Sequence, residues 1–410
     1  MANIRPFKAI RPTRDKANLV ASRSYLTYTD DSLKEKLDNN PFTFLHIINS
    51  DYNNNDKDSG KEKFIQVKQK FNEFLDKGIL FEEDKNCYYI YQQIKNDITF
   101  TGLIVSISVD DYLKGNIKIH EKTITKREEM FKEYLQSTNF NAEPVLLTYK
   151  ESDTISKILS FKKQERSEYE FTTTNQVCHK FWKIDETELI DTLTSELKKI
   201  NDIYIADGHH RTASSSLLCE SLRNKNPNYN KEDNFNYFMS YLISEKQIRI
   251  TNFNRLVKHK NGLTNTEFIN KIKNMYFIEG KGNKIYKPIL KDEISMYLSG
   301  KWWSLIAKPK KYNTKLDSLD PSILSNSILS PILGITNEKN DPNISFFDAT
   351  VSLSDLKNKV DSGEAEIAFI LKPIDIDSLK NVADNNEIMP PKSTYIEPKL
   401  RSGLTIYKLD

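Results

Sequence analysis

The chain has 410 residues, enough for two or three domains, and its 38% hydrophobic and 11% aromatic residues exclude a wholly disordered protein. Its 60 basic and 57 acidic residues leave a net charge of only +3, which argues against a strong nucleic-acid-binding field.

The first half of the chain carries strand and helix signals in alternation. The segment 49–60 is polar and is expected to be an exposed connection. Strands are predicted at 4–12, 42–48, 88–93, 99–109, 117–119, 143–149, 155–161 and 177–184, and the polar stretch 165–174 is also strand-prone. Helices are predicted at 61–77, 125–136 and 186–199, the last one capped by Asp185.

The second half begins with the most informative passage. A buried strand at 203–206 runs into a tight turn at 207–210 and then into a helix at 211–223. Further strands are predicted at 237–244, 247–252, 302–307 and 367–372, with helices at 264–275 and 291–298. We therefore expect an α+β fold with three regions, 1–112, 113–262 and 263–410, the middle one holding a mixed-sheet core.

The turn after the strand at 203–206 is our first candidate site. A helix N-terminus presents unpaired N–H groups and partial positive charge, so it attracts anions. Gly208 permits positive φ and close approach of a phosphate, Arg211 can grip two phosphate oxygens, and Thr212 can add a hydroxyl donor. His209 and His210 suit phosphate contact or proton transfer.

Asp207 is the most telling residue of this turn. A carboxylate beside a phosphate is repelled unless a cation or a proton intervenes, so Asp207 could hold Mg²⁺ or accept a proton from a hydroxyl. The alternative is structural: the turn would only cap a helix, with Asp207 as a hydrogen-bonding turn residue. We favour the functional interpretation because strand, acid, glycine, basic residues and helix occur together.

Two further segments offer polar groups. Glu121, beside His120 at the end of a short strand, could be a general base, although a solvated turn explains it equally well. The segment 389–404 is stiffened by prolines, and the alternative to a ligand site there is an ordered surface loop. Its side chains that could contact an anion are Lys392, Ser393, Thr394, Lys399 and Arg401.

Four motifs together carry a resemblance that spans nearly the whole chain. They are Arg5-Pro6-Phe7-Lys8-Ala9, His120-Glu121-Lys122-Thr123, Ala206-Asp207-Gly208-His209-His210-Arg211 and Met389-Pro390-Pro391-Lys392-Ser393-Thr394. In this order they resemble a widespread bacterial family, domain-of-unknown-function family 1015. The third motif is also similar to the phosphate-binding motif of the ParB and sulfiredoxin fold, which the free serine kinases share.

This resemblance implies a ParB/sulfiredoxin-like core that binds a nucleotide through Gly208, His209, His210, Arg211 and Thr212. It also implies catalytic roles for Glu121 and Asp207. From the chemistry of the side chains we add His209 as a catalytic candidate for proton transfer, and Lys392, Ser393 and Thr394 as secondary anion contacts. His209 stands where sulfiredoxins have a reactive cysteine, so cysteine-sulfinate reduction is not expected. The family's usual Pro-Tyr-Asp segment after Ser22 is replaced by Arg23-Ser24-Tyr25, which indicates a divergent substrate.

The resulting hypothesis is a kinase that transfers phosphate from ATP or ADP to a small hydroxyl-bearing metabolite, with free L-serine as the candidate acceptor and Asp207 as the candidate Mg²⁺ ligand. The alternative is a nucleotide-binding regulatory protein without turnover. Nucleic acid and membranes are not expected as partners, and the oligomeric state is left open. The three cysteines have no metal-ligand spacing, and no apolar run reaches signal-peptide or membrane-span length, so a cytoplasmic location is expected.

Overall fold

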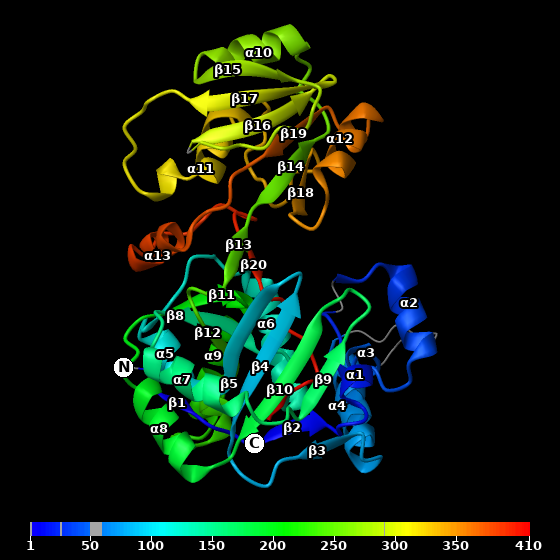
Figure 1. Cartoon of the computed structure of the whole chain (residues 1–410), viewed down its shortest axis with the longest axis vertical. Coiled ribbons are helices and arrows are strands. Elements are labelled where there is room, and N and C mark those ends of the chain that lie inside the picture. Colours follow the sequence, from blue (N-terminus) through cyan, green and yellow to red (C-terminus); the bar gives the residue numbers. More distant parts are fainter. Residues whose placement is uncertain (1, 25–26, 50–59, 291) are drawn as a thin grey trace. The chain divides into compact units, whose positions relative to one another are not determined.

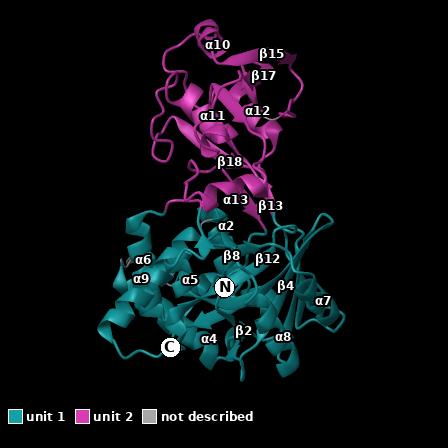
Figure 2. Ribbon diagram, turned by 90° about the vertical axis from the view of Figure 1, so that its left-hand side faces the viewer, with its two compact units in different colours: residues 1–119, 123–248, 398–410 teal, residues 120–122, 249–397 magenta. Residues whose placement is uncertain are grey.

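The computed structural model describes residues 2–24, 27–49, 60–290 and 292–410. The chain forms two compact units (Figure 2). The first comprises residues 1–119, 123–248 and 398–410, and the second comprises residues 120–122 and 249–397. The three regions expected from the sequence remain a prediction, although strands from the first two of them share one sheet. The expected connection at 49–60 and the departure at Tyr25 fall largely outside the described residues.

The first unit contains a nine-stranded mixed sheet and a small four-stranded sheet (Figure 1). Its strands are β1 Ile4–Arg5, β2 Ala9–Pro12, β3 Leu80–Glu82, β4 Tyr88–Lys95, β5 Ile98–Ser108, β6 Ile117–Lys118, β7 Phe140–Asn141, β8 Val145–Tyr149, β9 Tyr169–Thr172, β10 Cys178–Ile184, β11 Ile203–Asp207, β12 Tyr237–Ser244 and β21 Ile406–Lys408. Its helices are α1 Ala17–Val20, α2 Asp30–Asn39, α3 Leu45–Ile48, α4 Lys61–Asp76, α5 Val109–Leu113, α6 Thr125–Thr138, α7 Asp153–Lys162, α8 Thr187–Leu197 and α9 His209–Lys225.

The large sheet has the order β6-β11-β8-β12-β5-β4-β10-β9, with β1 beside β5. β6 pairs with β11 in parallel, as β8 does with β12, and the other neighbours are antiparallel. The expected mixed sheet and α+β class are therefore confirmed. The small sheet has the order β3-β2-β21-β7 and joins both termini of the unit.

The two faces of the large sheet bury different residues, as period-2 alternation requires. One face packs aliphatic side chains such as Ile90, Val105 and Leu147 against residues of α7, α8 and α9. The opposite face of β4, β9 and β10 is aromatic; neighbouring rings on it have centroids 5.1–6.5 Å apart, and all are buried except the half-buried Phe171. These rings are Tyr89, Tyr91, Tyr169, Phe171, His179 and Phe181.

The second unit is built on a six-stranded antiparallel sheet of order β15-β17-β16-β19-β14-β18, with a separate β13–β20 pair. Its strands are β13 Arg249–Thr251, β14 Phe253–Val257, β15 Tyr276–Gly282, β16 Glu293–Leu298, β17 Lys301–Ala307, β18 Ile344–Asp348, β19 Ile367–Ile370 and β20 Tyr395–Glu397. Its helices are α10 Asn265–Lys273, α11 Asp320–Leu324, α12 Leu353–Asp361 and α13 Ile376–Asp384. In the described part of the chain no helix is long and apolar enough to cross a membrane.

Four local predictions are wrong, each for a physical reason. The expected strand 155–161 lies in α7, because Ser152 caps that helix and Ile155 and Leu159 face the core one turn apart. The expected strand 42–48 ends in the short helix α3, since an apolar run of this length does not distinguish helix from strand.

The expected helix 291–298 is the strand β16, in which Ile294, Met296 and Leu298 alternate into the core. Asp185 does not cap α8, because Glu186 occupies the N-cap position and Asp185 instead pairs with Lys183 at 3.1 Å.

Candidate functional site

The candidate site is a strand–turn–helix junction in the first unit, formed by β11, Gly208 and α9. Residues 203–206 of β11 are buried, and Gly208 follows with φ 107° and ψ 27°. This backbone conformation favours glycine. The helix starts at His209, and its first bond runs from the Thr212 N–H to the Gly208 carbonyl at 3.1 Å. No side-chain hydrogen bond caps the start of α9, and the positive end of the helix dipole at this point favours an anion.

A β-bulge in β11 sets the direction of Asp207. Ile205 is opposite Leu147 of β8, but Asp207 is opposite Leu146, so Ala206 is the extra residue of the bulge. Leu147 faces the aliphatic core and its neighbour Leu146 faces the other way. Because directly opposed residues share a face, the bulge turns Asp207 away from the aliphatic core.

Two cations hold the Asp207 carboxylate. Arg211 donates from Nη2 to Oδ2 at 3.0 Å, and Lys399 donates from Nζ to Oδ1 at 3.1 Å. Burial by itself would raise the pKa of Asp207, but the charges of Lys399 and Arg211 outweigh it and the pKa is lowered. The Asp207 side chain keeps 40% exposure, so solvent also favours its ionised form. Asp207 is therefore a stable carboxylate and a weak base.

The Arg211 guanidinium lies over the turn and contacts a second acid. It approaches Glu143 Oε1 at 2.9 Å and donates to the Pro144 carbonyl at 2.6 Å. A Cβ added to Gly208 would lie 3.1 Å from guanidinium atoms of Arg211, so any larger residue there would require the guanidinium to shift by a few tenths of an ångström. Two carboxylates thus compete with any incoming anion for Arg211, and binding of a phosphate there requires a rearrangement of this ion-pair network.

The other predicted turn residues differ in accessibility. His209 is 4% exposed and His210 is half-buried. The buried Thr212 donates its hydroxyl to the Gly208 carbonyl at 3.3 Å, an intrahelical bond that occupies the donor expected to serve a ligand. Backbone N–H groups and Arg211 are therefore the better candidates for contact with an anion.

The remaining predicted residues belong to the second unit, so their distances to Asp207 are not defined. Glu121 is exposed, and the neighbouring His120 carbonyl accepts from the Met389 N–H at 2.9 Å. The Lys392 ammonium lies 5.1 Å from the centre of the Phe253 ring, and Ser393 donates to the Pro390 carbonyl at 2.8 Å. Roles for Glu121, Lys392, Ser393 and Thr394 in one site with Asp207 remain predictions.

Sequence reasoning missed Glu143 as a site residue and gave Lys399 only a general role as an anion donor. Glu143 precedes β8 and reaches the site because β8 is the neighbour of β11. Lys399 follows 192 residues after Asp207 and is brought back by residues 398–410 of the first unit. Neither contact leaves a local signal in the sequence.

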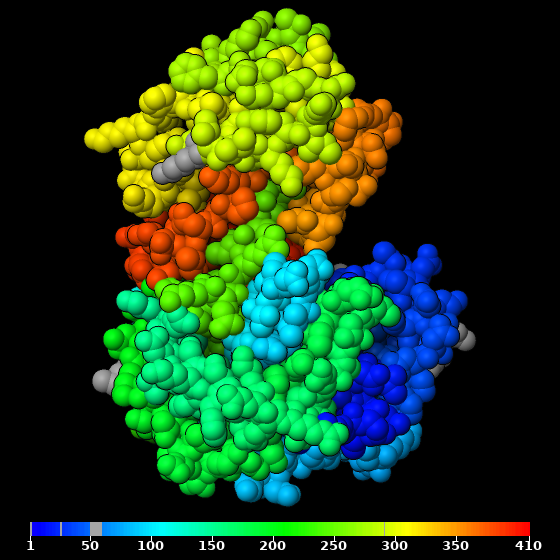
Figure 3. All heavy atoms as spheres, viewed as in Figure 1, coloured from blue at the N-terminus to red at the C-terminus, as the bar shows by residue number. Residues whose placement is uncertain are grey.

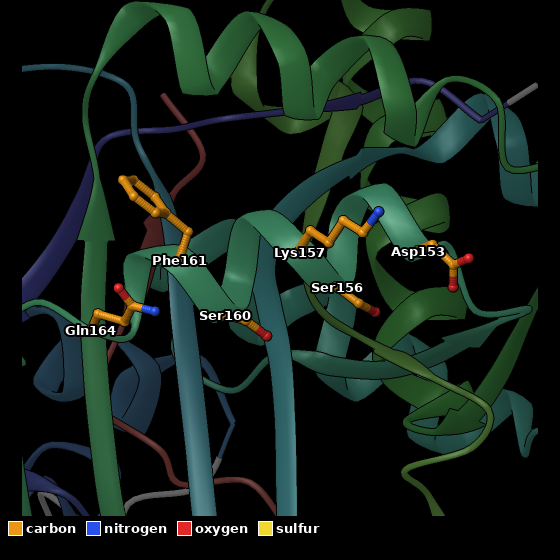
Figure 4. Close-up of a pocket in the computed structure, with 6 residues that line it drawn as sticks. All are labelled: Asp153, Ser156, Lys157, Ser160, Phe161 and Gln164. Atoms are coloured by element: carbon orange, nitrogen blue, oxygen red, sulfur yellow. The ribbon is translucent and has the colours of Figure 1, made fainter.

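The site residues fit a metal ion only in part. Within the described residues no group of three His, Cys, Asp or Glu side chains could form a metal-ligand set. Asp207 could contribute one oxygen to Mg²⁺, an ion that commonly takes its remaining ligands from phosphates and water. A shallow depression along α7, lined by residues such as Asp153, Lys157 and Phe161, contains none of the predicted site residues (Figure 4).

Comparison with known proteins identifies the family. Residues 4–322 match the model of a family described as "Protein of unknown function (DUF1015)". The chain belongs to this family. No curated protein matches its sequence. The family match spans the Asp207–Arg211 turn but ends before Lys399.

Several solved structures are distantly similar in fold. A free serine kinase variant in complex with AMP is 13% identical, with 74% of this chain and 92% of that chain covered and a TM-score of 0.40. A conserved hypothetical protein from Pyrococcus furiosus is 14% identical, with 75% and 95% covered and a TM-score of 0.37. C-terminally truncated SbnI from Staphylococcus aureus is 12% identical, with 74% and 87% covered and a TM-score of 0.38. Similarity at this level assigns no chemistry to this chain.

Proposed function

We propose that this protein binds a nucleotide at the Gly208–Thr212 turn and transfers its terminal phosphoryl group to a small hydroxyl-bearing metabolite, with free L-serine as the first candidate. The observation that supports this proposal is the placement of Asp207, Arg211 and Lys399 at an uncapped helix N-terminus. Phosphoryl transfer needs positive charge around the phosphates and an oriented hydroxyl, and little covalent chemistry from the protein.

The two acids, Asp207 and Glu121, would have different roles in this reaction. Asp207, with its lowered pKa, is a poor proton acceptor. Its role would be to bind Mg²⁺ beside the phosphates and to keep the ammonium group of Lys399 there. Mg²⁺, when bound, supplies charge that offsets the developing negative charge on the transferred group. Arg211 would leave Glu143 and Asp207 to contact phosphate oxygens.

The reaction breaks the bond between the terminal phosphorus and its bridging oxygen and forms a bond to the acceptor oxygen. The acceptor's proton then needs a base, for which Glu121 is the predicted residue. Buried His209 is better suited to position the turn or relay a proton than to contact solvent.

The second candidate is a regulatory protein that binds a nucleotide without turnover. It is favoured by one feature: Arg211 is already paired with both Asp207 and Glu143. A nucleotide would break these pairs, and such a rearrangement can be the output of a sensor as well as a step in catalysis.

The first experiment is a thermal-shift screen with ATP, ADP, CTP and GTP in the presence of Mg²⁺. A nucleotide at 100 times its Kd stabilises the folded state by about 2.7 kcal/mol, or roughly 5–10 °C for a unit of this size. Arg211→Gln should lose the shift. Arg223→Gln is the matched control, since Arg223 pairs with Asp110 and lies in the last turn of the same helix.

Product analysis then separates the two candidates. Formation of phosphoserine from L-serine, lost in Glu121→Gln, supports the kinase. A shift with no product from any hydroxyl compound supports the regulatory protein, and no shift with any nucleotide rules out both.

A further inference from the structure

A second cationic cluster lies in the first unit, on residues 398–404. We call this segment the C-terminal strap. Lys399 of the strap contacts Asp207, and its carbonyl accepts from the Gln93 side chain at 3.1 Å. Two residues further on, Arg401 turns to the β9–β10 hairpin and is only 8% exposed. The strap therefore carries a buried positive charge onto the aromatic face of the sheet.

Arg401 has no acidic partner among the residues that the structure describes. Its Nη2 donates to Thr173 Oγ1 at 3.3 Å and to Asn175 Oδ1 at 3.2 Å, both neutral oxygens at long distances. By contrast, the buried Arg11 of the same unit pairs with Glu83 and Glu168. A buried guanidinium without a carboxylate is costly, because its lost hydration is not offset by an ion pair.

His179 adds a buried donor beside Arg401. Its Nδ1 lies 2.8 Å from the hydroxyl of Tyr91, and the ring stacks on Phe171 at 5.1 Å. The buried Tyr91 hydroxyl makes no other hydrogen bond with the described residues, and the tautomer with the proton on Nδ1 would leave the phenolic proton without an acceptor there. We therefore assign the phenolic proton to the bond with Nδ1 and the imidazole proton to Nε2. That Nε2–H is buried and has no hydrogen-bond partner in the described part of the chain. Burial, followed by the charge of Arg401, lowers the pKa of His179 to about 3, which keeps it neutral.

The second cation near Arg401 is Arg23, which belongs to the N-terminal segment of the chain. Ser22 and Ser402 form an antiparallel bridge, so Arg23 is in register with Arg401. The Arg23 guanidinium lies 4.7 Å from the centre of the Tyr28 ring. Burial lowers the pKa of Arg401; Tyr91 and then Tyr28 partly oppose this shift, and the Arg23 charge adds a smaller lowering. Two like charges opposite each other are unfavourable unless an anion lies near them.

We propose that Arg401, the Nε2–H of His179 and Arg23 form a binding site for a small carboxylate. The Nε and Nη1 donors of Arg401 are not used by Thr173 or Asn175, so they can receive an anion. Of the two guanidiniums only that of Arg401 is buried, whereas Arg23 is exposed. One buried cation, one neutral N–H and surrounding aromatic rings match a monoanion with an apolar body better than a phosphate dianion. Figure 3 shows the tips of the neighbouring β4–β5 (cyan) and β9–β10 (green) hairpins at the surface of the unit. This site does not depend on nucleotide binding at the Gly208–Thr212 turn.

The test is a set of thermal melts at constant ionic strength in Tris chloride, free of carboxylate and phosphate. The probes are acetate, glycolate and L-serine, with acetamide as the uncharged analogue and inorganic phosphate as the alternative anion. At least one carboxylate should raise the Tm of the wild type, and acetamide should not. The shift should disappear in Arg401→Met and should need at least tenfold more ligand in His179→Gln.

The ligand-free Tm separates a binding role from a structural one. Arg401→Met removes an uncompensated buried charge, so its ligand-free Tm should equal or exceed that of the wild type. Arg11→Met is the matched control, because it removes a buried arginine that has acidic partners and should lower the Tm.

Three results would overturn the proposal. The proposal is overturned if no carboxylate raises the Tm of the wild type, whatever the variants show. A fall in ligand-free Tm for Arg401→Met as large as that of Arg11→Met would make Arg401 a structural tie of the β9–β10 turn. A shift with phosphate alone would reject the ligand class. Arg401→Met should keep any ATP-induced shift of the wild type, so failure of the nucleotide proposal is recognised separately.

Discussion

Acid stability should depend strongly on one histidine of the aromatic face. His179 is 1% exposed, and burial, with the Arg401 charge, lowers its pKa from 6.5 to about 3. The unfolded state therefore takes up the proton first as the pH falls. The stabilisation from neutral His179 is complete above about pH 6.5 and is lost progressively between about pH 6.5 and pH 3. Each pH unit in this window lowers the free energy of unfolding by about 1.4 kcal/mol.

The perturbation is His179→Gln, which keeps a neutral acceptor for Tyr91 but has no proton to gain. Two units below the unfolded pKa, at about pH 4.5, the wild type should have lost roughly 2.7 kcal/mol that the variant retains. The free energy of unfolding is measured by urea titration at a series of pH values, in buffers without carboxylate. Substitution of Gln for the exposed His259 is the control for the loss of an imidazole.

The comparison uses the pH dependence and not the absolute stability, because the substitution also removes the stacking of His179 on Phe171. Other groups, including Asp207, titrate equally in both proteins and cancel in the difference. Parallel stability curves for the wild type and His179→Gln between pH 7 and pH 4.5 would refute the reasoning and show that the imidazole is hydrated or protonated in the folded state.

Three further predictions concern stability. Gly208→Ala should lower the free energy of unfolding by about 1–3 kcal/mol because of its φ of 107°, and should abolish nucleotide shifts by displacing Arg211; urea titration and the nucleotide screen check both effects. Leu147→Ala, in the centre of β8, should lower the free energy of unfolding measured by urea titration by about 2–5 kcal/mol. A loss below about 1 kcal/mol would mean that neighbouring side chains move into the cavity. Arg11→Met should cost about 3–5 kcal/mol by leaving the buried Glu83 with only the more distant Lys183, at 3.5 Å, as a cationic partner, whereas the double change with Glu83→Gln should recover part of the loss.

The sequence predicted those elements whose pattern is local. The helix α4, the β4–β5 hairpin and the strand–turn–helix around Gly208 were all recognisable from periodicity and turn residues. The strand 155–161 was misassigned because β-branched and aromatic residues suggested a strand, while the packing of Ile155 and Leu159 on the core stabilises a helix. Tertiary contacts outweigh propensity there.

The candidate site shows the same limit. Asp207, Gly208 and Arg211 are adjacent in sequence, and their pattern was sufficient to single them out. The bulge that orients Asp207, the pairing of Glu143 with Arg211 and the arrival of Lys399 all depend on which strands are neighbours in the sheet. Strand order is not encoded in any one segment, so these contacts could not be derived from the sequence.

The return of residues 398–410 to the first unit has a consequence for the order in which the protein is made. Asp207 and Lys399 are separated by 192 residues, and the second unit is encoded almost entirely between them. At roughly 5–20 residues per second, a ribosome adds Lys399 about 10–40 s after Asp207. During that interval the nascent first unit lacks both the strap and β21, which joins β2 to β7. The Asp207 turn is therefore completed only after the second unit has been synthesised, and a chain released before Lys399 would display this acidic junction without its second cation.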